Sequence, residues 1–333
     1  MVLLPVVLLL AEITPPQPDV SYSQPQIAYD GQNTGIVFGS KNAIYYAQGD
    51  STPVRVADAP VLSLGNHRGP RLAFAAGTIV VTAGVGPANQ QYGPNTLRSW
   101  RSVDHGKTWT PGPDVSSPGT GGMGFQAIAS DGKLRLWAVW IGQSNGQPKL
   151  FASHSEDAGV TWTRQRVLSE TVCECCHPNV IIAADGAIHV LFRNSLDGNR
   201  DFYLASSADG ENFQIRKLGR ESWQINACPM DGGGMAELKG EVVTLWRRQN
   251  QLFLSRPDGK PEEPFAVGKN AAVALRENGI YAVWSTSQGI MAKAPEKEAW
   301  LLSRTGAFPV IAASGPVVVA WEDGQKIRTA RID

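Results

Sequence analysis

The sequence predicts an all-β protein built from repeated four-stranded antiparallel sheets, and three observations support this fold class. The composition is rich in turn formers, with 35 glycines and 22 prolines, and it also contains 10 tryptophans. An octapeptide motif recurs about every fifty residues, and short apolar segments recur in phase with it. Glycine and proline favour turns and aromatic residues favour strands, so these features indicate many short strands rather than helices.

The octapeptide has the pattern Ser-x-Asp-x-Gly-x-x-Trp. It occurs as SVDHGKTW at 102–109 and as SEDAGVTW at 155–162, and the two glycines are 53 residues apart. A degenerate third copy comprises Ser206, Asp209, Gly210 and Phe213, and a fourth remnant comprises Ser255, Asp258 and Gly259. Ser and Asp side chains accept hydrogen bonds from backbone N–H groups in turns, and Gly readily adopts positive φ. The motif therefore predicts a structural hairpin and not a catalytic site.

Apolar strands surround each hairpin motif in the same order. A first strand ends in a glycine turn, and a second and a third strand follow it, as in FQAIASDG, LRLWAVW and LFASHS. Seven such units cover residues 25–333. Radial repetition of four-stranded sheets is how a β-propeller leaves only short, protected sheet edges. The sequence therefore predicts one β-propeller, with seven blades preferred and six as the alternative.

The chain begins with the apolar run MVLLPVVLLLAEITPP. Residues 2–10 resemble the hydrophobic part of a secretory signal, although no basic residue precedes them. We predict that residues 1–14 form an N-terminal apolar segment that directs export and that residues 15–333 form the propeller. The alternative is that the run is a β-strand that completes the last blade. Export predicts a secreted or periplasmic protein.

The charge and the lengths of the apolar segments argue against two classes of partner, nucleic acids and membranes. The formal net charge is zero and only 18% of the residues are charged, so no basic stripe for nucleic acid is expected. No segment reaches the roughly 18 apolar residues that a membrane span requires. We expect a monomer.

The octapeptide is similar to the Asp-box, or BNR repeat, of the sialidase superfamily. The resemblance implies a sialidase-like propeller with Asp-box hairpins at its periphery and a small-molecule or glycan ligand at the central channel. Sialidases grip a substrate carboxylate with three arginines and use a tyrosine nucleophile. The candidate arginines here are Arg68, Arg71, Arg193 and Arg247, with ordinary rim arginines as the alternative for the last two. No tyrosine occupies a matching position, so the resemblance leaves open whether the protein is an enzyme.

The four cysteines of the chain fall at equivalent places in two neighbouring repeats. Cys173, Cys175 and Cys176 precede one inner strand and Cys228 precedes the next, and the prolines that follow them, Pro178 and Pro229, are 51 residues apart. This spacing is one repeat. The repeat register therefore predicts that all four cysteines converge on the ligand face, near the axis.

Three interpretations of these cysteines are open: disulfides, a metal site, or inert thiols. An even number of cysteines in an exported protein favours disulfides. Three thiols within four residues are difficult to pair without strain, which favours a metal. Thiolates select soft ions such as Cu(I) and zinc. We predict a site formed by Cys173, Cys175, Cys176, Cys228 and His177, with copper favoured over zinc.

Three functional hypotheses follow. The first is a metal-binding protein or metal-dependent enzyme on a sialidase-like propeller. The second is an exo-glycosidase that acts on acidic sugars and has its cysteines in disulfides. The third is a propeller that binds a partner without catalysis.

Overall fold

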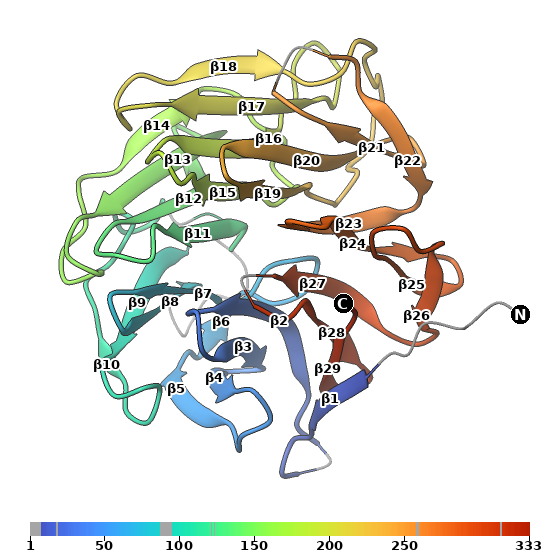
Figure 1. The fold of residues 1–333 in the computed structure, drawn as a ribbon. Coiled ribbons are helices and arrows are strands. Elements are labelled where there is room, and N and C mark those ends of the chain that lie inside the picture. Colours follow the sequence, from blue (N-terminus) through green and yellow to red (C-terminus); the bar gives the residue numbers. More distant parts are fainter. Residues whose placement is uncertain are drawn as a thin grey trace, which may run out of the picture.

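The computed structural model describes residues 8–17, 19–86, 95–120, 122, 124–257, 260–313 and 315–333. Within these residues every regular element is a β-strand, and the strands form seven antiparallel sheets arranged in a ring (Figure 1). The colours of Figure 1 pass once around the ring, so each blade follows the preceding one in the sequence. The predicted all-β propeller is confirmed, with seven blades rather than six. No helix in these residues is long and apolar enough to cross a membrane.

The first four blades each begin with a strand near the axis, and later strands lie progressively further out (Figure 1). Blade 1 contains β2 (Tyr22–Tyr29), β3 (Thr34–Ser40), β4 (Ala43–Gln48) and β5 (Val54–Asp58). Blade 2 contains β6 (Val61–Leu62), β7 (Arg71–Ala75), β8 (Thr78–Gly86), β9 (Thr96–Ser102) and β10 (Thr110–Pro111). Blade 3 contains β11 (Gln126–Ser130), β12 (Leu136–Ser144), β13 (Gln147–Ser155) and β14 (Arg166–Ser169). Blade 4 contains β15 (Asn179–Ile182), β16 (Ile188–Arg193), β17 (Phe202–Ser207) and β18 (Gln214–Lys217).

The last three blades complete the ring. Blade 5 contains β19 (Gly234–Leu238), β20 (Glu241–Arg248), β21 (Gln251–Ser255) and β22 (Glu263–Val267). Blade 6 contains β23 (Lys269–Arg276), β24 (Gly279–Thr286), β25 (Gly289–Lys293) and β26 (Trp300–Ser303). Blade 7 contains β27 (Ala307–Ala312), β28 (Val318–Asp323), β29 (Lys326–Arg331) and, as its outer strand, β1 (Leu8–Ile13).

Blade 7 is therefore built from both ends of the chain. Strand β1 pairs antiparallel with β29, and Ile13 lies opposite Ile327. The Tyr22 N–H at the start of blade 1 donates to the Gln325 carbonyl at 3.0 Å. The second half of the N-terminal apolar run thus occupies the closing strand that the sequence left open as an alternative. Residues 1–7 lie outside the described part of the chain, and export stays a prediction.

The hydrophobic core is divided among the junctions between neighbouring blades. Between blades 3 and 4, Val139 and Leu150 pack with Val190 and Phe192, and all four are fully buried. Similar clusters occupy the other junctions. Each sheet is thus buried on both faces, and its inner strand is held at the axis.

The Asp-box hairpins have the structure that the sequence predicts. In the first copy, Asp104 accepts hydrogen bonds from Ser102 Oγ (2.8 Å) and from the N–H of Thr108 (2.9 Å). The second copy repeats both contacts from Ser155 and Thr161 to Asp157. The prediction that the third copy begins at Ser206 is wrong.

In that third copy the hydroxyl that bonds the aspartate belongs to the following serine. Ser207 Oγ donates to Asp209 at 2.8 Å, whereas Ser206 Oγ lies 2.8 Å from His189 Nδ1. The Ser-to-Asp spacing is therefore conserved and the turn after it is one residue shorter. Asp258 and Gly259 of the fourth remnant lie outside the described residues.

Candidate functional site

The inner strands of the seven blades surround an axial channel with a volume of about 480 Å³. His67, Arg71, His177 and Phe308 contribute to its wall. Glu237 is the only described residue in this lining that carries a carboxylate. The channel lining therefore contains one arginine, one glutamate and two histidines among its described residues.

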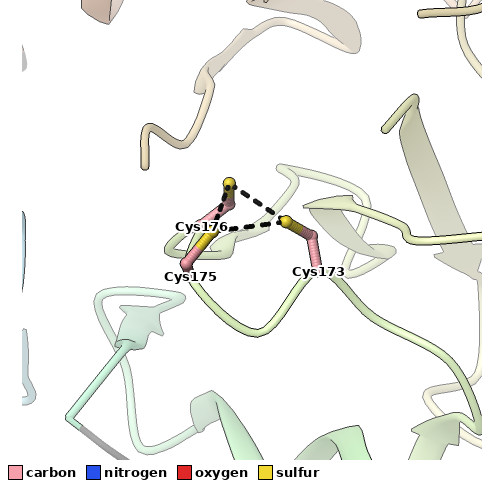
Figure 2. Close-up of side chains that lie close together, drawn as sticks. All are labelled: Cys173, Cys175 and Cys176. Atoms are coloured by element: carbon pink, nitrogen blue, oxygen red, sulfur yellow. Dashed lines mark hydrogen bonds between the residues drawn. The ribbon is translucent and has the colours of Figure 1, made fainter. Parts of the chain in front are cut away.

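The loop between β14 and β15 gathers three thiols into one cluster beside this channel. The Sγ atom of Cys173 lies 3.6 Å from that of Cys175 and 3.4 Å from that of Cys176, and the last two are 3.8 Å apart (Figure 2). The loop coils because the Cys176 N–H donates back to the Cys173 carbonyl, and the Cys173 N–H donates to the Arg193 carbonyl at 2.8 Å. We call these three residues the sulfur cluster. Among the described residues it is the only group of ligand atoms that fits one metal ion.

Cys228 approaches the sulfur cluster from the loop between β18 and β19. Its side chain is exposed, and its thiol interacts with that of Cys175. Cys173 and Cys176 are fully buried, and Cys175 is partly buried. Two loops from neighbouring blades thus bring the four cysteines together, with Cys228 at the solvent side.

The protonation of the four thiols is uneven. Contacts with the Cys175 and Cys176 thiols, together with the nearby Arg193 guanidinium, hold the pKa of Cys173 well below its usual range. Burial raises the pKa of Cys176, and contact with Cys175 raises the pKa of Cys228 to about 11. Cys173 is therefore the thiol of the cluster that loses its proton most readily.

A buried ion network supports both cysteine loops. Asp231 lies 3.1 Å from Arg193 Nη2 and 2.9 Å from Arg247 Nε, and its side chain is 1% exposed. Arg193 is fully buried and also donates to the carbonyls of Arg200 and Arg247. Both guanidinium groups lie over the ring of Trp223, at 5.2 and 5.1 Å. Asp231 lies in the loop before β19, three residues after Cys228, but its role depends on arginines from β16 and β20 and carries no local sequence signal.

The other two candidate arginines lie in blade 2. Buried Arg71 donates to the carbonyls of His67 and Pro70, and burial lowers its pKa to about 10. Arg68 lies over the ring of Phe125, 4.6 Å from its centroid. The structure therefore joins Arg193 and Arg247 through Asp231 and leaves Arg71 in the channel wall. The four arginines do not form one cluster open to a ligand.

His177 joins the sulfur cluster to the channel. Its backbone follows Cys176, but its Nδ1 accepts a hydrogen bond from the Gly232 N–H at 3.1 Å, and its ring stacks on His67 at 4.5 Å. A Cβ at Gly232 would lie 2.5 Å from His177 Cε1, so this contact requires glycine. Burial lowers the pKa of His67 to about 4 and also lowers that of His177, so both rings are neutral at pH 7. The roles of His177 and Cys228 as metal ligands stay predictions.

Fold and sequence together define the class: a seven-bladed propeller with Asp-box hairpins. The chain belongs to the family of BNR repeat-like domains, whose model matches residues 42–226. A comparison with curated protein sequences finds no match.

Several solved structures share the fold. A Hadza microbial sialidase is 17% identical with a TM-score of 0.55, over 89% of this chain and 73% of its own. An α-L-arabinanase of Penicillium chrysogenum is 12% identical with a TM-score of 0.56, over 99% of both chains. A GH93 α-L-arabinofuranosidase of Fusarium graminearum is 11% identical with a TM-score of 0.54, over 97% of both chains. At these identities the similarity establishes the fold alone.

Proposed function

We propose that this propeller binds one soft metal ion at the sulfur cluster and that copper(I) is the preferred ion. The observation that carries the proposal is the separation of the three sulfur atoms, 3.4 to 3.8 Å. Metal–sulfur bonds of about 2.3 Å in a tetrahedral site place the sulfurs roughly 3.8 Å apart. An ion therefore fits among these three sulfurs with shifts of a few tenths of an ångström, and the Cys228 thiol lies beside that of Cys175.

The ligand atoms favour copper(I) over harder ions. All three are cysteine sulfurs, and thiolates prefer soft ions such as Cu(I). Zinc is the alternative outcome of the test below.

The test is elemental analysis of protein purified without reductant or chelator, together with a count of free thiols. We expect one copper ion per chain and about a hundredfold weaker Cu(I) binding in Cys176→Ser, because a buried ligand is lost. His189→Gln is the control, since His189 belongs to blade 4 but pairs with Ser206 outside the cluster. Four oxidised cysteines without stoichiometric metal would overturn the proposal and establish two disulfides instead.

A second candidate function is the hydrolysis of glycosidic bonds. It is favoured by the axial channel, whose volume suits a small ligand, and by the fold shared with a sialidase and an arabinanase. Glu237 is the acidic group among the described residues of the channel lining, and Arg71 lines the same channel. Turnover of a fluorogenic sialoside or arabinoside that is lost in Glu237→Gln would support this function. Unchanged turnover in that variant would exclude Glu237 as its acid.

Export belongs to the proposal as well. In an oxidising compartment, a bound metal ion would prevent the four thiols from forming disulfides. Fractionation of cells that express the full chain should place the protein in the periplasm or the medium. Recovery from the cytoplasm alone would contradict this part of the proposal.

A further inference from the structure

The four cysteines form a series from the interior to the surface. Cys173 and Cys176 are fully buried, Cys175 is partly buried and Cys228 is exposed. Cys175 contacts both the buried pair and Cys228, so each thiol touches the next one in the series. A fourth ligand of a closed structural site would be expected to be buried with the other three.

Met230 places a second soft donor on the same exposed loop. Its side chain is 41% exposed, and its backbone has φ of +56°. A non-glycine residue in this left-handed region costs free energy, and an exposed methionine regains little of it by packing. The thioether of methionine binds Cu(I), as thiolates do. Cys228 and Met230 are thus two sulfur donors that lie two residues apart on one exposed loop.

We propose that Cys228 and Met230 form an exchange edge through which the sulfur cluster receives Cu(I) from a small thiol that carries it. This inference rests on the proposed function, because it concerns how the same site is loaded. Cys228 and Met230 bind the ion first, at the protein surface. Cys175 then binds it and passes it to the buried thiols of Cys173 and Cys176.

The transfer is a ligand exchange without oxidation or reduction. The Cys228 sulfur forms a bond to the ion as its S–H proton leaves, and one bond between the ion and a carrier thiolate breaks. The released carrier thiolate takes up that proton. Cys175 displaces a second carrier thiolate in the same way. Cys176 then displaces the Cys228 sulfur, which takes up the proton that Cys176 loses, and the Cys173 thiolate binds the ion without losing a proton, so copper stays Cu(I) throughout.

A small carrier suits the surroundings of Cys228. The loop from Asn226 to Cys228 is exposed, and the nearest charges on the Cys228 thiol come from Glu174 and Arg200, which have opposite signs. A carrier therefore needs neither a strongly charged surface of its own nor a shape that enters a deep cleft to reach this thiol. The Cu(I) complex of glutathione is therefore the probe.

The experiment measures the rate of Cu(I) loading from glutathione under anaerobic conditions by stopped-flow spectroscopy. We expect Cys228→Ser to load about tenfold more slowly than the wild type and Met230→Leu about threefold more slowly. Met235→Leu is the control, because Met235 is buried on β19 and lies outside the loop.

The outcomes separate this inference from the proposed function. If the wild-type protein holds no Cu(I) at equilibrium, the proposed function fails. If it holds one ion and Cys228→Ser loads at the wild-type rate, only the exchange edge is overturned. An unchanged loading rate with faster loss of the ion would also overturn it and would make Cys228 a simple fourth ligand.

Discussion

The Asp-box hairpin at 102–109 and the cysteine loop at 171–177 are both short connections of the propeller, yet they are stabilised in opposite ways. In the hairpin, Ser102, Asp104 and Thr108 satisfy one another within seven residues. The cysteine loop takes its partners from other blades or strands: Arg193 for Cys173, and Gly232 for His177.

This difference separates structural turns from the candidate site. A turn whose polar groups are satisfied locally can be copied from blade to blade, as the Asp-box is. A buried ion network such as that of Asp231, Arg193 and Arg247 is not copied from blade to blade in this way, because it must be assembled from distant segments. The unusual loop is therefore where function is expected, and the three predictions below compare it with the hairpins.

The largest effect is expected from Asp231→Ala. This change leaves Arg193 and Arg247 buried without their shared carboxylate, and breaking such a network costs about 3–5 kcal/mol. Asp114→Ala is the control, because Asp114 pairs with Arg98 at 3.5 Å on the exposed surface, where a pair contributes about 0–1 kcal/mol. Denaturant unfolding measures both. Equal losses would contradict the distinction between the two regions.

A smaller effect is expected from the pH dependence of His67. Burial, with Arg71 and Lys269 nearby, lowers its pKa to about 4, while Asn270 opposes the shift and His177 stacks on the ring. The unfolded chain therefore binds a proton that the folded protein does not bind between pH 6.5 and 4. Stability from this group is complete above pH 6.5 and declines below it, by at most about 1.4 kcal/mol per pH unit.

Two matched variants test this pH dependence. His67→Asn should flatten the decline in unfolding free energy between pH 6.5 and 4. His105→Asn is its control, because His105 has nearly the same φ, +61° against +63°, on the exposed Asp-box hairpin. A pH profile of His67→Asn that matches the wild type would refute the role of His67.

The smallest effect is expected from Asp104→Asn. Hydrogen bonds from the Thr108 side chain and backbone lower the pKa of Asp104, so its carboxylate stabilises the hairpin above the ordinary pKa near 4 and ceases to do so as the pH falls. The thermal midpoint should decrease slightly at pH 7, and the difference from the wild type should shrink at pH 3. Metal content should not change, and its loss would contradict the separation of the two regions.

The sequence alone determined the architecture. Repeated glycine turns, strand alternation and the octapeptide are local features, so seven blades could be counted before any coordinates were known. The repeat register also predicted that the two cysteine loops come from neighbouring blades. The starting serine of the third Asp-box was misjudged because adjacent serines, Ser206 and Ser207, differ only in which side of the strand they face.

Tertiary structure decided what surrounds those cysteines. Asp231 meets Arg193 and Arg247 only because the loop before β19 lies against strands β16 and β20, and no spacing in the chain reveals it. The sequence alone allows the N-terminal apolar run to be either a leader or a β-strand. In the structure, Leu8–Ile13 is a strand because it pairs with β29. The direction of His177 toward the channel depends on Gly232, 55 residues away. Repetition is encoded locally, whereas burial and charge partners arise from contacts between distant segments.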